Sequence, residues 1–138
     1  MITLRTSQVE AICSHARETA PAECCGLVGG TEDSQARNVY RLGNVSTEPL
    51  VSYEAAPEEL FSAQRRMRER GEQLLAIYHS HPRSTEPTPS ETDVRLAFYP
   101  SAVYLIIGLG AVEASMRAFR ISEREQCWER VVYQVVGE

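Results

Sequence analysis

Two histidines, His79 and His81, stand two residues apart at the end of a continuous apolar run. Because side chains on a strand alternate between its two faces, residues at this spacing point to the same side. Two imidazoles on one side can bind one metal ion, and a catalytic zinc site is completed by a third protein ligand and one open position for water. The spacing therefore predicts a metal site that needs one further ligand.

Asp93 is the nearest downstream candidate for that ligand. It is one of only two aspartates among 19 acidic residues, and the other, Asp33, falls in a polar turn. Ser90 and Asp93 also match a helix start, with Ser90 as N-cap and the Asp93 carboxylate near the positive end of the helix. The two interpretations are compatible, because a capped helix can direct Asp93 towards a metal ion.

Helical and strand patterns alternate along the chain and must position these residues. Apolar residues spaced three and four apart indicate helices, and short apolar runs bounded by glycine, proline or polar residues indicate strands. The predicted helices cover residues 8–19, 57–70 and 90–99, and the predicted strands cover residues 24–30, 37–42, 74–79, 102–107, 112–121 and 127–136. Their order indicates a single α/β domain over residues 1–138, with a mixed sheet flanked by helices.

Local signals add detail to these elements. Residues 7–10 match a capping box at the start of the first helix. In the second helix Phe61 and Met67 share a stripe, and in the third Phe98 shares a face with apolar neighbours. Prolines exclude a helix from residues 83–89, which are predicted to form a stiff exposed loop.

Composition excludes several classes of protein. The net charge is −5 and all 14 basic residues are arginines, which disfavours a nucleic-acid-binding domain. No window approaches the roughly 20 apolar residues that span a membrane, and the start lacks the apolar region of a signal peptide. We therefore expect a cytoplasmic protein that binds neither membrane nor nucleic acid. Its four cysteines are expected to be reduced and mostly buried.

Taken together, the motifs resemble those of the JAMM (MPN-plus) zinc metalloproteases, in their short stand-alone prokaryotic form. The matching segments are His79-Ser80-His81-Pro82, then Ser90-x-x-Asp93, and upstream Glu23-Cys24-Cys25-Gly26. The resemblance implies one zinc per chain held by His79, His81 and Asp93, with Glu23 as the acid/base residue and Ser90 at the oxyanion position. It also implies a curved mixed sheet between helices, related to the fold of cytidine deaminases.

The loop before Asp93 departs from the family motif. Eleven residues separate His81 from Asp93, where the family usually has ten. The extra residue falls in the proline-rich loop, where a bulge can absorb it. The departure therefore concerns the loop shape more than the ligands.

The function implied by the resemblance is hydrolysis of an amide bond by zinc-activated water. The substrate would be a ubiquitin-like or sulfur-carrier protein, cut after its C-terminal Gly-Gly tail. Two alternatives stay open, a non-catalytic interaction scaffold with the same fold and a zinc amidase acting on a small metabolite.

A nucleoside deaminase is disfavoured because its H-x-E and P-C-x-x-C motifs do not occur. Cysteine catalysis is disfavoured because Cys24 and Cys25 lie in an apolar run.

Overall fold

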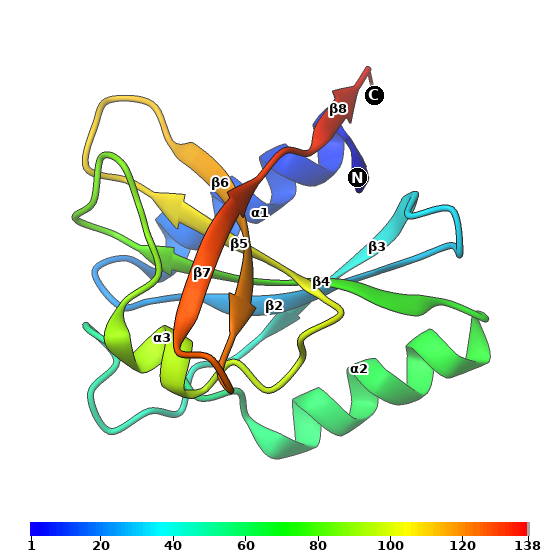
Figure 1. Ribbon diagram of the computed structural model, residues 1–138, viewed down its shortest axis with the longest axis horizontal. Helices are drawn as coiled ribbons and strands as arrows, with labels where there is room; N and C mark the ends of the chain where they lie inside the picture. The colour runs from blue at the N-terminus through cyan, green and yellow to red at the C-terminus, as the bar shows by residue number, and fades with distance from the viewer. Residues whose placement is uncertain (138) are drawn as a thin grey trace.

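The computed structural model describes residues 1–137, and within that range the chain forms three helices and eight strands (Figure 1). The helices are α1 (Thr6–Thr19), α2 (Pro57–Glu69) and α3 (Glu91–Arg95). The strands are β1 (Thr3–Arg5), β2 (Cys25–Gly30), β3 (Ala36–Leu42), β4 (Gln73–His81), β5 (Val103–Gly108), β6 (Ser115–Ser122), β7 (Cys127–Val131) and β8 (Gln134–Val136).

Most strands join one mixed sheet in the order β3-β2-β4-β5-β6-β7. Strands β4 and β5 run parallel, and the other neighbours in this sheet run antiparallel. A separate parallel pair joins β1 to β8. The predicted α/β fold with a mixed sheet flanked by helices is confirmed. Within residues 1–137 no helix is long and apolar enough to cross a membrane.

Strand β4 lies inside the sheet and is covered on both faces. Tyr78 packs with Ile12 of α1 in one apolar cluster, while Ile77 packs with Met67 of α2 and Val94 of α3 in another. This double burial explains why the strand reads as an unbroken apolar run. It also determines where the histidines lie, because His79 and His81 share the face of Ile77.

Helix α1 begins earlier than the sequence predicted. Its N-cap is Arg5, the last residue of β1, and not Ser7. Gln8 replaces the predicted glutamate, because its side chain accepts a hydrogen bond from the Arg5 backbone N–H (2.8 Å) and donates one to the Ala36 carbonyl (3.1 Å). The buried Gln8 thus ties the helix start to β3, which the local pattern could not reveal.

Two aromatic residues predicted on apolar faces are exposed. The buried face of α2 is set by Ala63 and Met67, and Phe61 lies on the far side with 62% exposure. Phe98 is also 62% exposed, because α3 ends at Arg95 and the helical spacing stops there. Helical spacing alone therefore does not identify which aromatic residues contact the sheet.

The predicted strand over residues 127–136 is two strands with different partners. β7 pairs with β6, and β8 pairs with β1 at the other end of the chain. Between them the Tyr133 hydroxyl donates to the Met116 carbonyl (2.8 Å), and the Gln134 N–H donates to the Ile2 carbonyl (3.0 Å). These long-range bonds lie where the pairing of β7 with β6 ends and the pairing of β8 with β1 begins.

The cysteines agree with the prediction of free thiols, most of them buried. Cys13, Cys24 and Cys25 are buried and Cys127 is exposed, and all are free.

Replacing Gly26 by alanine is expected to destabilise the sheet. A Cβ there would lie 2.3 Å from the Tyr78 ring, which cannot swing away because it is fully buried and its hydroxyl lies 2.6 Å from Nδ1 of His15. We expect Gly26→Ala to lower the free energy of unfolding by about 1–3 kcal/mol in urea titrations. Gly137→Ala is the control, since a Cβ there meets nothing within 4 Å. Equal stability of the two variants would contradict this packing.

Candidate functional site

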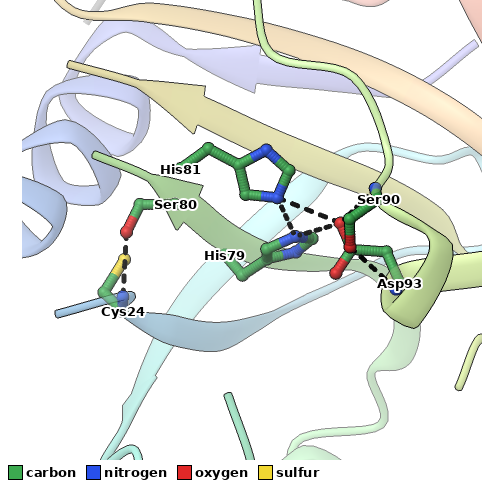
Figure 2. Close-up of polar contacts among 6 residues, drawn as sticks. All are labelled: Cys24, His79, Ser80, His81, Ser90 and Asp93. Carbon is green, nitrogen blue, oxygen red and sulfur yellow. Dashed lines mark hydrogen bonds and ion pairs between the residues drawn. The ribbon is translucent and has the colours of Figure 1, made fainter. Parts of the chain in front are cut away.

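His79, His81 and Asp93 converge at the end of β4, as Figure 2 shows. Oδ2 of Asp93 lies 3.0 Å from Nε2 of each histidine, and the two Nε2 atoms are 3.2 Å apart. Ligand bonds of about 2.0–2.1 Å in a tetrahedral zinc site would put ligand atoms ~3.3 Å apart. The three atoms are therefore spaced as ligands of a single small cation.

The two histidine rings are held by their surroundings. The His79 side chain is fully buried and that of His81 is 17% exposed. His79 stacks on Tyr53, with ring centroids 4.6 Å apart and planes 28° apart. Among residues 1–137, Nδ1 of His79 has no hydrogen-bond partner. The His79 ring is therefore held by stacking on Tyr53, and not by a hydrogen bond at Nδ1.

A capping box at the start of α3 aims Asp93 at the histidines. The Asp93 N–H donates to the Ser90 hydroxyl oxygen (3.0 Å), and the Ser90 N–H donates to Oδ2 of Asp93 (2.9 Å). The carboxylate that caps the helix is thus the one that faces both imidazoles. The capping and metal-site interpretations of this motif are compatible in the structure.

The loop before α3 is exposed as predicted at Arg83, Thr85, Glu86 and Thr88, but not throughout. Pro87 and Pro89 are buried, because the loop folds back onto the turn between β5 and β6. The Ser84 N–H donates to the His81 carbonyl (3.0 Å), and the Ser84 carbonyl accepts from the Gly110 N–H (2.8 Å). With the extra residue in this loop, Asp93 still reaches both histidines.

Glu23 lies beside this cluster, just before β2. One of its carboxylate oxygens is within 4.8 Å of a ring nitrogen of each histidine, and the side chain is 5% exposed. Its backbone is held on both sides, since the Glu23 N–H donates to the Pro49 carbonyl (2.7 Å) and its carbonyl accepts from Asn44 (2.9 Å). Yet Oε1 of Glu23 has no hydrogen-bond partner within the described residues.

The electrostatics separate the two carboxyl groups. Burial raises the pKa of Glu23 to about 7, against the lowering effect of His81 and with a further rise from Asp93. Burial also acts to raise the pKa of Asp93, but His79, His81 and the Ser90 backbone outweigh it and hold that pKa well below its usual value. The site therefore combines a permanently ionised carboxylate with one that can exchange a proton near neutral pH.

Asp93 also shifts the pKa of His81. Burial acts to lower its pKa, but the hydrogen bond to Asp93 and the negative charge of that carboxylate outweigh burial and leave the pKa above its usual value. The histidine and the carboxylate thus stabilise each other's charged forms.

The site lies between two hollows that the sequence did not predict. A groove of about 570 Å³ runs between α2 and α3, with an apolar lining that includes Leu74 and Ile77 of β4, and it reaches Asp93. A second hollow of about 530 Å³ opens beside Glu23 and Ser90. Both are assembled from loops and helices far apart in the chain. Tyr53 was missed for the same reason, because a tyrosine in a polar loop carries no signal of contact with a histidine.

Comparison with known proteins identifies the family. The family model of prokaryotic homologues of the JAB domain matches residues 5–122. The chain belongs to this family. The resemblance to the JAMM (MPN-plus) proteins inferred from the motifs is thereby confirmed.

Relatives of this JAB protein have names that describe cleavage of protein conjugates. Desampylase of Haloferax volcanii is 43% identical over 112 residues (76% of this chain and 78% of the relative). The CysO-cysteine peptidase of Mycobacterium tuberculosis is 35% identical over 108 residues (78% and 73%). A probable TtuB-protein conjugate cleaving protease of Thermus thermophilus is 35% identical over 113 residues (82% and 71%).

Solved structures share the JAB fold. A protein of Desulfitobacterium hafniense matches with a TM-score of 0.87 and 34% identity, covering 100% of this chain and 94% of that one. A JAB1/MPN domain protein of Archaeoglobus fulgidus matches with a TM-score of 0.66 and 23% identity, covering 99% of each chain, which shows the fold alone.

Ser80 is expected to anchor Glu23 through the neighbouring backbone. Its hydroxyl accepts a hydrogen bond from the Cys24 N–H (2.8 Å), and both residues are fully buried. Ser80→Ala leaves that N–H unpaired, so we expect the free energy of unfolding to fall by about 1–3 kcal/mol. The exposed Ser62→Ala is the control and should change it by less than about 0.5 kcal/mol. Equal chemical-denaturation midpoints for the two variants would show that the bond does not hold this strand junction.

Proposed function

We propose that the protein is a zinc-dependent metallopeptidase that hydrolyses the amide bond after the Gly-Gly tail of a ubiquitin-like or sulfur-carrier protein. The observation that carries the proposal is the position of Glu23. A buried carboxyl group with an unpaired oxygen lies within 4.8 Å of a ring nitrogen of His79 and of His81, and these two histidines are spaced with Asp93 as metal ligands. An unpaired buried oxygen is costly in a purely structural cluster, whereas a hydrolase needs a group there to accept a proton from water.

The donor set supports zinc. Two imidazole nitrogens and one carboxylate oxygen are the ligands of many catalytic zinc sites, and they leave one position for water. We assign His79, His81 and Asp93 as the ligands, one zinc per chain. Asp93 is preferred to Glu23 because the same oxygen is 3.0 Å from both histidine nitrogens and is oriented by the Ser90 N–H. Glu23 is then left free for proton transfer.

Proton transfer falls to Glu23. Zinc bound in such a site lowers the pKa of water from 15.7 to about 7 and polarises a carbonyl group. Glu23 takes the proton as the water oxygen attacks the scissile carbonyl, and returns it to the leaving amine when the C–N bond breaks. Burial raises the pKa of Glu23 in the cation-free site to about 7, which makes the carboxylate a stronger proton acceptor than an exposed glutamate.

Ser90 stabilises the charge that develops on the carbonyl oxygen. Its hydroxyl oxygen already accepts from the Asp93 N–H, so the hydroxyl proton is left to donate elsewhere. Ser90 is exposed and lines the hollow that also contains Glu23 and His81. A donor of this kind typically contributes 10²–10³ in rate.

The groove supports an extended tail as the substrate. Its wall includes Leu74 and Ile77 of β4, and it also includes Asp93, whose carboxylate lies beside His79. Five residue steps from Leu74 to His79 correspond to ~17 Å of strand, enough for five or six residues of extended chain. The relatives act, by their names, on CysO-cysteine and on conjugates of TtuB. A carrier with a flexible tail fits this groove, whereas a small metabolite would leave most of it empty.

The native protein is expected to contain about one zinc per chain. His79→Ala removes one of three ligands, so bound zinc measured by inductively coupled plasma mass spectrometry should fall to near zero. His15→Ala is the matched control and should keep its zinc, because His15 contacts Tyr78 on the opposite face of the sheet. Native protein without zinc at micromolar supply would favour the scaffold alternative.

Glu23→Gln is expected to keep zinc and lose turnover. The amide cannot accept the proton, so cleavage of a Gly-Gly-tailed sulfur-carrier conjugate, followed by mass spectrometry with a chelator control, should slow by about 10²–10⁴-fold. The exposed Glu32→Gln serves as control and should cleave normally. Loss of zinc together with activity would show that Glu23 is a ligand. Zinc-loaded protein that cleaves a small amide but never the carrier would overturn the proposed substrate.

A further inference from the structure

Four exposed arginines lie together beyond the far end of the groove, at the end of β1, on β3, on α2 and directly after α2. We call them the arginine face; they are Arg5, Arg37, Arg66 and Arg70. They line two adjoining hollows of about 470 and 390 Å³, which share Asn38 and Arg70. Positive charge is thus concentrated on one surface of a protein whose net charge is −5.

Two of these guanidinium groups are held in place over a single ring. Those of Arg66 and Arg70 lie 5.5 and 5.7 Å from the centroid of Tyr40, which is 4% exposed. Nη1 of Arg70 also donates to the Tyr40 hydroxyl (3.0 Å). Holding the side chains in this way lowers the entropy lost when they bind a partner. The arrangement is more ordered than that of ordinary solvated arginines.

The arginines of this face are not neutralised within the described chain. Across residues 1–137, none of the four forms an ion pair with an acidic side chain. Glu59 and Glu72 also line these hollows, but Oε1 of Glu59 accepts a hydrogen bond from the Gly43 N–H, and both oxygens of Glu72 accept hydrogen bonds from Asn38 and Tyr40. A guanidinium group can bind a carboxylate through two parallel N–H···O bonds, which makes arginine a preferred donor for carboxylates. The face therefore offers unused donors to an anionic partner.

The arginine face continues the substrate groove. Glu72 lines both the groove and the adjoining hollow that contains Arg5, Arg37 and Arg70. A tail that reaches Asp93 at one end leaves the groove near Glu72 at the other. The folded body that carries the tail would then rest over β3 and the C-terminal half of α2.

We propose that the arginine face binds an acidic surface of the carrier protein, next to the tail that lies in the groove. This inference rests on the proposed function and adds the chemistry that selects the partner. Complementary charge of this kind accelerates association and excludes carriers with basic surfaces. The contact acts on the folded body, so it should matter for an intact carrier and not for a detached tail.

The test uses two probes with the same tail and the same fluorogenic amide. One is a six-residue peptide ending in Gly-Gly, and the other is a ubiquitin-fold carrier with acidic residues beside its Gly-Gly tail. The zinc-loaded full chain is compared with Arg37→Glu/Arg66→Glu. Arg124→Glu/Arg130→Glu is the control, since it changes the net charge equally at exposed arginines outside the face.

We expect Arg37→Glu/Arg66→Glu to raise KM for the carrier at least about tenfold, with kcat and the peptide KM within twofold of the parent. The control should leave both KM values within twofold. Equal changes for peptide and carrier, or an equal effect of the control, would overturn the docking surface. If the double variant does not fold, Arg37→Glu alone must raise the carrier KM selectively. A parent protein that cleaves neither probe would instead overturn the proposed function.

Discussion

The site depends on the pairing of β4 between β2 and β5. Inside the sheet, β4 is covered by helices on both faces. Its alternating side chains therefore divide between the apolar cluster that contains Ile12 of α1 and the one that contains Met67 of α2 and Val94 of α3. His79 and His81 consequently emerge on one face at the strand end. A shift of one residue in register would turn both rings to the other face and separate them from Asp93. The close fit of Gly26 against Tyr78 helps to fix that register.

Short polar bonds then bring the other groups to the histidines. The capping box of α3 orients Asp93, and the Ser80 hydroxyl ties the start of β2 to the end of β4, directly after Glu23. Each bond is local to its element or to one strand pair. Together they hold Glu23 and His81, which are 58 positions apart in the sequence, with ligand atoms within 4.8 Å of each other. Burial raises the pKa of Glu23, whereas the two histidines and the Ser90 backbone hold that of Asp93 down, and this difference separates the roles of the two carboxyl groups.

The sequence allowed prediction of the central strand, the hairpin before it and the placement of the two histidines at the strand end, because these follow from local periodicity. His79 and His81 could be placed on one face from their spacing alone. The sequence could not show Tyr53 stacked on His79, the burial of Pro87 or the division of the last strand, since each depends on contacts between distant segments. The start of α1 also differs from the prediction, because Gln8 bonds to the Ala36 carbonyl of β3. Phe61 is exposed, because the helical spacing does not show which face of α2 contacts the sheet.

The central claim is that three side chains hold zinc while a fourth, Glu23, remains outside the ligand shell. It is tested most directly by crystallising the zinc-loaded protein and mapping anomalous scattering at the zinc absorption edge. We predict one peak bonded to Nε2 of His79, Nε2 of His81 and a carboxylate oxygen of Asp93, with Glu23 near the metal but not bonded to it. A peak bonded to Glu23 in place of Asp93, or zinc bound at another site, would contradict this account.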